Sequence, residues 1–414
     1  MRILWFTGRQ KKLNRSFYGG GGWIRSLGSE LARCENVELA WSYFSDEKQD
    51  EHELNGILQY PMYLKPKNKF KKLYDYWVLN PEYSDEYLLD CMQTVIRKFR
   101  PDVIQIFGTE SMFTSLIGKT EIPVILYIQG VLNPIANAYY PYAMNEYTLK
   151  YWRFDKREWL FKNGRIHREK QLLQLAEKEK IVFKAAKYII GRTHLDYNVS
   201  RFFSPSSHYF KVNEMMREPF YEGKQWVRPQ TNCYRIFSTL SNVTYKGFDV
   251  ILKTARLLKE HGCNFHWHIA GLTERDEIVT LFEKLTGISS RNVNVEYLGI
   301  LGEIELKTAL LESNVLVHPS YIDNSPNSVG EAQLLGLPVV ACYVGGVPDL
   351  IESGVTGELI PSNDPYSLAY IINKDMEEPF LYEYSQRAYE EAIHRHDKKT
   401  ILSDILNVYK EVTK

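Results

Sequence analysis

The chain has few cysteines, no long apolar run, no internal repeat and no excess of charge of either sign. Its 5 cysteines among 414 residues are odd in number and in no metal-ligand spacing, which predicts reduced thiols in a cytoplasmic protein. The 51 basic and 51 acidic residues cancel, so the basic excess typical of a nucleic-acid-binding protein is missing. No apolar run reaches the roughly 18–20 residues of a membrane span, and the apolar start of the chain is too short for a signal peptide. We therefore expect neither an integral membrane protein nor a partner of nucleic acid.

Length and composition indicate a globular protein with more than one domain. The 414 residues are 44% hydrophobic and 25% charged, and a chain of this length is expected to form two domains of about 150–200 residues each. Short apolar runs alternate with amphipathic segments in both halves of the chain. The runs expected to be strands are 3–6, 37–43, 103–107, 124–128, 188–190, 235–239, 265–270, 293–298, 315–318 and 339–342. Strands separated by helices predict parallel sheets joined by right-handed crossovers.

The alternation of apolar runs and amphipathic segments is interrupted once, and this interruption predicts the domain boundaries. Residues 1–212 are expected to form an N-terminal Rossmann-like domain, and residues 213–232, which contain two prolines and a glycine, a linker. Residues 233–396 are expected to form a second Rossmann-like domain. The last helix, in 397–414, has no strand after it, so we expect it to pack back on the first domain. Two such sheets in tandem predict a ligand cleft between the domains, at the carboxyl ends of their strands.

The stretch 318–361 carries the clearest chemical pattern. Asp323 and Glu331 flank an expected strand-to-helix turn, and Gly345-Gly346 follow the next strand. Carboxylates accept hydrogen bonds from neighbouring hydroxyls, so paired acids in such a turn suit a sugar-rich ligand. Backbone N–H groups at glycine turns and helix starts suit a phosphate. The stretch therefore predicts a nucleotide-sugar site.

Two further loops are candidates for the phosphate side of this site. Four glycines, 19–22, follow the first strand and open an expected helix. They allow either close approach of the backbone to an anion or a flexible turn, and they do not form the G-x-G-x-x-G dinucleotide pattern. Lys246 precedes another helix, where it places a cation near the cleft or is merely solvated.

Three other patterns favour ordinary packing or solvation. His266 and His268 share one face of a strand, as a metal pair would, but we see no third ligand nearby and favour packing on the sheet. The lysine-rich run 65–72 is typical of a solvated loop. Residues 139–168 interleave aromatic and basic side chains, which suits anionic lipid at the inner face of a membrane, a carbohydrate, or a helical hairpin packed on the first domain. We favour the hairpin.

The second half of the chain resembles the retaining glycosyltransferases of family four, which have the GT-B fold of two Rossmann-like domains facing across a deep cleft. The resemblance covers roughly 234–370, with Gly21-Gly22 as its first-domain counterpart. It implies a nucleotide-sugar donor, a saccharide acceptor on the first domain, retention of anomeric configuration, and no required metal or other cofactor. The motifs that carry it are Lys246-Gly247, Ala270-Gly271, Tyr297-Leu298-Gly299, His318-Pro319-Ser320, Asp323 to Glu331, 336–341, Gly345-Gly346 and 357–361.

The resemblance also assigns roles to residues. Glu331 is expected to hold the ribose hydroxyls, Asp323 the hydroxyls of the transferred sugar, and Lys246 the diphosphate; these three form the expected catalytic set. The expected donor-binding set adds Gly21, Gly22, Asn324, Ser325, Asn327, Ser328, Gly345 and Gly346. The acceptor-side candidates are Gln129, Asn133 and Arg192.

Four positions depart from the family's pattern. Asp323 stands where glutamate is usual, Pro326 where a glycine often offers its N–H, Ser241 where an arginine commonly joins the lysine, and Gln129 where a histidine is usual. We predict a cytoplasmic hexosyltransferase that uses a nucleotide-diphosphate sugar, UDP-linked in our prediction, to build a surface polysaccharide or glycolipid. Two alternatives remain: a GT-B sugar-nucleotide epimerase, for which we find no acid–base set, and a non-catalytic member that binds a nucleotide sugar or glycan in an assembly.

Overall fold

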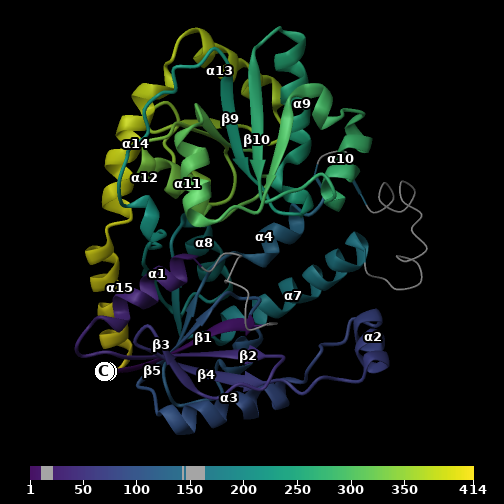
Figure 1. The fold of residues 1–414 in the computed structure, drawn as a ribbon. Coiled ribbons are helices and arrows are strands. Elements are labelled where there is room, and N and C mark those ends of the chain that lie inside the picture. The colour runs from purple at the N-terminus through teal and green to yellow at the C-terminus, as the bar shows by residue number, and fades with distance from the viewer. Residues whose placement is uncertain (11–21, 142–143, 146–163) are drawn as a thin grey trace. The chain divides into compact units, whose positions relative to one another are not determined.

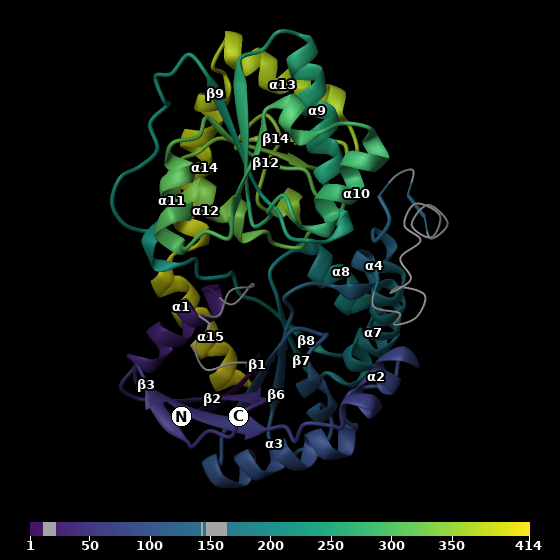
Figure 2. The ribbon, with the colours of Figure 1, turned by 45° about the vertical axis from the view of Figure 1, so that its right-hand side comes forward.

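The chain folds into two compact units, each built on one sheet (Figures 1 and 2). The computed structural model describes residues 1–10, 22–141, 144–145 and 164–414. The first unit comprises 1–136, 145–215 and 398–414, and the second comprises 137–144 and 216–397. Residues 216–226, within the stretch expected to be a linker, thus belong to the second unit.

The first unit holds an eight-stranded sheet in the order β3-β4-β2-β1-β5-β6-β7-β8. Its neighbours pair in parallel except β3, which is antiparallel to β4. Its strands are β1 (Arg2–Gln10), β2 (Glu38–Ser45), β3 (His52–Leu54), β4 (Ile57–Tyr63), β5 (Val103–Phe107), β6 (Val124–Tyr127), β7 (Tyr188–Gly191) and β8 (His208–Lys211). Its helices are α1 (Gly22–Ala32), α2 (Lys69–Trp77), α3 (Asp85–Phe99), η1 (Met112–Leu116), α4 (Leu132–Asn137), α7 (Arg165–Ala185), α8 (His194–Phe203) and α15 (Lys398–Val412).

The second unit holds a six-stranded sheet in the order β11-β10-β9-β12-β13-β14. All of its neighbouring strands pair in parallel. Its strands are β9 (Tyr234–Thr239), β10 (Phe265–Ala270), β11 (Val295–Gly299), β12 (Val315–His318), β13 (Val339–Cys342) and β14 (Glu358–Ile360). Its helices are η2 (Glu218–Phe220), η3 (Thr244–Lys246), α9 (Phe248–Glu260), α10 (Glu277–Thr286), η4 (Ser290–Val293), α11 (Glu303–Leu311), α12 (Asn327–Leu335), η5 (Val347–Asp349), α13 (Pro365–Glu377) and α14 (Leu381–Arg395).

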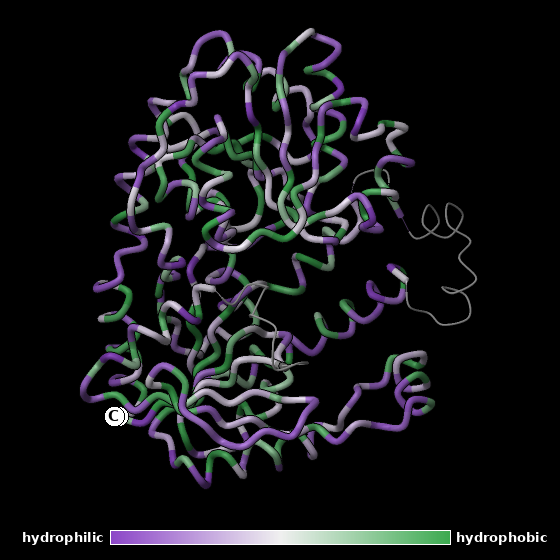
Figure 3. Tube along the Cα trace, viewed as in Figure 1, coloured by the Kyte–Doolittle hydropathy of each residue, from purple (hydrophilic) through white to green (hydrophobic). Residues whose placement is uncertain are grey.

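The predicted fold class, α/β with two Rossmann-like parallel sheets, is confirmed. Hydrophobic and hydrophilic residues alternate along the helices (Figure 3), as helices that cover a sheet on one face require. Strands β5, β12 and β13 are buried along their whole length, which is why each is mostly apolar in sequence. Among the described residues, no helix is both long and apolar enough to cross a bilayer.

The two ends of the chain meet in the core of the first unit. Helix α15 packs beside α1 (Figures 1 and 2) and contributes Ile401, Ile405 and Tyr409 to a cluster that also contains Trp5. The Trp5 Nε1–H donates to the Tyr409 hydroxyl over 3.0 Å, and that hydroxyl donates to Gln105 Oε1 over 2.7 Å.

The second unit begins with a segment that is part of its core. Met216, Phe220 and Trp226 are buried in a cluster with the strands and helices of this unit. The Trp226 Nε1–H donates to the carbonyl of Ser313 over 2.6 Å. The prolines and glycine of 213–232 therefore mark an irregular path for the backbone, and the side chains along it are anchored.

Candidate functional site

The acids singled out in the sequence lie beyond the carboxyl end of β12: Asp323 is in the turn that leads to α12, and Glu331 is within α12. Strands β12 and β9 are neighbours in the parallel sheet, so the loop after β9 lies beside this turn. The two loops touch at Gly247, whose φ is +77° and where an added Cβ would lie 2.0 Å from the carbonyl oxygen of Pro319. Only glycine fits this close approach, and it brings the neighbouring Lys246 to the acids.

Asp323 is the centre of a charged cluster. Its Oδ2 lies 2.5 Å from Lys246 Nζ and 3.0 Å from His318 Nε2, and its Oδ1 accepts the Asn324 N–H over 3.0 Å. Burial alone would raise the pKa of Asp323, but Lys246 and His318 more than offset this and hold that pKa well below its usual range. The carboxylate is therefore charged at neutral pH. The sequence predicts no role for His318, although it lies in one of the motifs of the family resemblance; its place at the end of β12, just before the turn, is the available signal.

The Gly345-Gly346 turn holds Asp323 from the other side. The Gly346 N–H donates to the carbonyl oxygen of Asp323 over 3.0 Å. Gly345 has a φ of +54°, and a Cβ there would lie 1.9 Å from the same oxygen. The Gly346 N–H therefore positions the first acid, and the place of Gly345 and Gly346 in the donor-binding set stays a prediction.

Glu331 lies in the second turn of α12 and is held by an arginine that we did not predict. Arg217 donates from Nε to Glu331 Oε1 over 2.6 Å and from Nη2 to Oε2 over 2.7 Å. The Glu331 side chain is 3% exposed and that of Arg217 20%. Burial raises the pKa of Glu331, and the two hydrogen bonds from Arg217 oppose that rise. No local pattern in the sequence could have found Arg217, which lies 114 positions before its partner.

The rest of the donor loop surrounds the two acids. Asn324, Ser325 and Pro326 are buried, and Asn327 and Ser328 are half-buried in the first turn of α12. The N–H groups of a helix's first turn have no partner within the helix, and they add positive potential at this end of α12. The arrangement offers two carboxylates for hydroxyl groups, two cations beside them, and a helix start suited to an anion.

The first unit has its own candidates at the carboxyl ends of its sheet. The Arg192 side chain, after β7, donates from Nη2 to the carbonyls of Gln129 over 2.8 Å and Ile128 over 3.3 Å. Its guanidinium carbon lies 5.1 Å over the ring of Trp23. The structure thus brings Arg192 and Gln129 together. Gly22 opens α1, and Gly21 lies outside the described residues.

Asn133 performs a different task. Its side-chain amide donates to Glu179 Oε2 over 2.7 Å and to the carbonyl of Ala176 over 2.9 Å, both on α7. Glu179 is fully buried and also accepts the backbone N–H of Leu132 over 2.8 Å. Asn133 therefore fastens α4 to α7, and its predicted role on the acceptor side stays a prediction. Most of the aromatic-basic segment 139–168 (142–143 and 146–163) lies outside the described residues.

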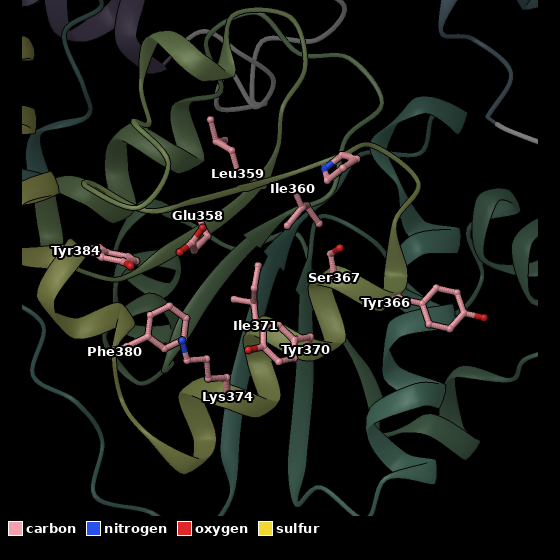
Figure 4. A pocket seen from close by; sticks show the side chains of 11 residues that line it. Glu358, Leu359, Ile360, Tyr366, Ser367, Tyr370, Ile371, Lys374, Phe380 and Tyr384 are labelled. Atoms are coloured by element: carbon pink, nitrogen blue, oxygen red, sulfur yellow. The ribbon is translucent and has the colours of Figure 1, made fainter.

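A separate hollow of about 570 Å³ lies between β14 and helices α13 and α14 (Figure 4). Tyr366, Tyr370, Phe380 and Tyr384 line it, and the Lys374 ammonium lies 4.5 Å over the Phe380 ring. None of the expected donor-binding residues lines this hollow.

The comparisons with known proteins agree with the fold and with the motifs. Residues 235–377 match the family described as Glycosyl transferases group 1. A relative, the amylovoran biosynthesis glycosyltransferase AmsK of Erwinia amylovora, is 30% identical over 146 residues, which cover 33% of this chain and 35% of AmsK. The match thus spans about a third of that relative's length.

Two solved structures share the whole architecture. Sucrose-phosphate synthase from Thermosynechococcus elongatus superposes with a TM-score of 0.71 at 14% identity, covering 99% of this chain and 98% of that one. Anabaena Alr3699/HepE in complex with UDP and glucose gives 0.65 at 16% identity, covering 99% of both chains. The fold is GT-B, and residues 235–377 of the second unit are similar to the family Glycosyl transferases group 1. The predicted deep cleft stays a prediction.

Proposed function

We propose that the protein is a retaining glycosyltransferase that moves a hexose-type sugar from a nucleoside-diphosphate sugar to a saccharide acceptor. The observation that carries this is the pairing of two acids from the segment β12–α12, each with a cation: Asp323 with Lys246, and Glu331 with Arg217. The family match supports the reaction class. The polysaccharide role named for AmsK supports surface polysaccharide or glycolipid synthesis, with a glycan or lipid-linked saccharide as acceptor.

The cations suit the chemistry of the leaving group. In the transfer, the bond between the sugar C1 and the diphosphate breaks while the acceptor oxygen bonds to C1 on the same face. The acceptor's proton passes to the leaving phosphate oxygen, so no separate base is needed. Lys246 donates to the diphosphate as its negative charge grows, which stabilises the transition state more than the ground state. In this proposal the ammonium does the work that a metal ion would otherwise do.

The two acids orient the donor. Glu331 accepts hydrogen bonds from the ribose hydroxyls, and Asp323 accepts them from the transferred sugar. The UDP bound to HepE makes a uridine nucleotide our first choice of donor. Gln129, held near Arg192, is our candidate for contact with the acceptor.

A thermal-shift panel tests the donor site. UDP, GDP, ADP, dTDP and their sugar conjugates are added to the full chain, and a ligand at 100 times its Kd is expected to stabilise it by about 2.7 kcal/mol. Lys246→Ala is expected to abolish the shift and the turnover. Lys253→Ala is the matched control, because Lys253 forms a similar ion pair with Asp249 over 2.8 Å on α9 and is expected to change neither.

Two outcomes separate this proposal from its rivals. No shift with any nucleotide would overturn the assignment of the donor site. A selective shift with epimerised donor and no transferred sugar would favour the epimerase, and binding without any reaction across an acceptor screen would favour the non-catalytic alternative.

A further inference from the structure

Two histidines and a glutamate meet on neighbouring strands of the second unit. His266 and His268 are two positions apart in β10, so both point to one face of the sheet. Glu296, on the edge strand β11, is the register partner of His268. Its Oε1 lies 2.9 Å from His266 Nδ1 and its Oε2 lies 3.6 Å from His268 Nε2. The sequence showed no third ligand near the histidine pair, and that expectation is wrong, because strand pairing supplies one.

We propose that His266, His268 and Glu296 form a binding site for a divalent transition-metal ion, with zinc as the favoured occupant. Imidazole nitrogen and carboxylate oxygen are the ligands that zinc takes in proteins, at about 2.0–2.2 Å. Tetrahedral ligands at such lengths lie about 3.3–3.5 Å from one another. The three ligand atoms here lie within 4.8 Å of one another, so small side-chain rotations close the site. Three protein ligands leave the fourth position to water.

The residue between the two histidines holds β10 in place. Trp267, between the histidines, is fully buried and donates from Nε1 to the Ser238 hydroxyl over 3.1 Å. This contact fixes the rotation of β10 and thereby the direction of both imidazoles.

The site is separate from the donor site. His266 is near the amino end of β10, whereas Lys246 and Asp323 lie beyond the carboxyl ends of β9 and β12. A metal here joins β10 to the edge strand β11. We therefore expect it to stabilise the second unit and to leave sugar transfer unchanged.

The test is a zinc titration of the chelator-stripped full chain, read by competition with a chromophoric chelator. We expect one ion per chain with micromolar or tighter affinity, and weakening by about tenfold or more in His266→Ala and in Glu296→Gln. His394→Ala, at an exposed histidine of α14, is the control and is expected to match wild type. Equal zinc affinity in wild type and His266→Ala would overturn the site.

The absorption spectrum of bound cobalt distinguishes a metal held by these ligands from one held by the chain's free cysteines. Cobalt bound at the proposed site is expected to absorb in the visible range without a thiolate charge-transfer band. A strong thiolate band that persists in His268→Ala would place the metal on cysteine and overturn the proposal. Nucleotide shifts and turnover are expected to be the same with and without zinc, so failure here is distinct from failure of the donor site.

A second and independent observation concerns α2. Phe70, Leu73, Tyr74 and Trp77 recur at helical spacing on one face, and their exposed fractions run from 42% to 85%. The buried residue of this helix is instead the charged Asp75, paired with Lys67 over 2.8 Å. The helix therefore turns its apolar face outward, the reverse of a helix that packs on its own core. Our prediction of a solvated loop at 65–72 is corrected, because residues from Lys69 onward are helical.

We infer that α2 docks on an anionic lipid bilayer. Lys69, Lys71 and Lys72 are exposed beside the apolar stripe, and mixed aromatic and basic side chains are what an interfacial helix presents to anionic lipid. Helix α2 lies at the margin of the first unit, and hydrophobic and hydrophilic residues mix along it (Figures 1 and 3). A helix of nine residues buries little area, so the binding is weak and sensitive to salt.

Vesicle co-sedimentation tests the docking. We expect the chain to sediment with phosphatidylcholine–phosphatidylglycerol vesicles at low salt, and not with pure phosphatidylcholine or at high salt. Phe70→Ser with Trp77→Ser is expected to abolish binding. Tyr366→Ser, at a residue that is 72% exposed in the second unit, is the control. Binding that survives the double substitution, or a chain that never sediments with anionic vesicles, would overturn the proposal; the latter would point to a protein partner for this face.

Discussion

The two sheets use polar side chains differently at their carboxyl ends. In the second unit, Lys246 and Arg217 pair with the carboxylates of Asp323 and Glu331. In the first unit, Arg192 donates to backbone carbonyls and pairs with the buried Glu214 over 3.9 Å, and Asn133 donates to a backbone carbonyl and to the buried Glu179. The partly exposed Lys246–Asp323 pair can exchange partners with a ligand, whereas the bonds of Arg192 and Asn133 hold the backbone of the first unit in place. The carboxyl end of the second sheet is thus suited to a charged ligand, whereas the side chains at the carboxyl end of the first sheet hold its backbone in a fixed shape.

The largest expected effect comes from breaking the pair at α12. Arg217→Met leaves the buried carboxylate of Glu331 without its cation and is expected to lower the free energy of unfolding by about 3 kcal/mol. The double variant with Glu331→Leu is expected to recover most of that stability but none of the nucleotide binding. Urea unfolding measures the stability of both variants, and the thermal-shift panel measures their nucleotide binding. A single variant as stable as wild type would show that the pair does not hold this end of the sheet.

The next effect concerns the turn behind Asp323. Gly345→Ala places a methyl group against the carbonyl oxygen of Asp323, at a position with φ of +54°. Gly354→Ala is the matched control, with φ of +77° and no atom within 4 Å of the added methyl. Gly345→Ala is expected to lower the free energy of unfolding by about 2 kcal/mol more than Gly354→Ala does, and to weaken nucleotide binding. Equal costs would mean that backbone strain alone, not the contact with Asp323, makes glycine necessary.

A smaller effect is expected in the first unit. Asn133→Ala removes the bonds to Ala176 and Glu179 and is expected to lower the free energy of unfolding by about 1–2 kcal/mol. Because Asn133 fastens α4 to α7 and does not bind the donor in our proposal, the thermal shift with nucleotide is expected to equal that of wild type. Loss of the thermal shift with nucleotide in Asn133→Ala would contradict the view that the first unit's polar side chains serve structure and not donor binding.

The smallest effect is one of pH. The pKa of Asp323 is lowered in the folded protein, so its contribution to stability is present above the unfolded carboxyl pKa of about 3.9 and is lost as pH falls toward the folded value. Between these limits wild type is expected to lose stability more steeply than Asp323→Asn. Unfolding curves taken from pH 5 downward measure the slopes. Identical slopes would mean that Lys246 and His318 do not stabilise the charged form.

The fold was largely predictable because the central parallel strands are rich in apolar residues. Strands β5, β10, β12 and β13 have the bounds that the sequence indicated. Strand β3 was missed because it is exposed throughout, so no apolar pattern marks it. Strands β8 and β14 were not among the predicted runs either; each is short and lies at one edge of its sheet.

The site was predictable only in part. The sequence indicated that Lys246 and Asp323 belong to one site, and the structure places them 2.5 Å apart. The partners of Glu331 and of the histidine pair could not be read, because Arg217 and Glu296 come from distant segments. Their position depends on strand register and on the path of 216–226, which local patterns do not encode. The role of Gly346 likewise depends on a backbone contact.

The contact between Trp5 and Tyr409 has a consequence for biosynthesis. Trp5 and Tyr409 are 404 positions apart, so the first unit cannot complete its core until α15 has emerged from the ribosome. The main body of the second unit, 216–397, is continuous and emerges before that. Because domains fold as units during synthesis, the second unit matures first. A nascent chain stalled before α15 is therefore a folded second unit attached to an unfinished first one, a natural substrate for chaperones.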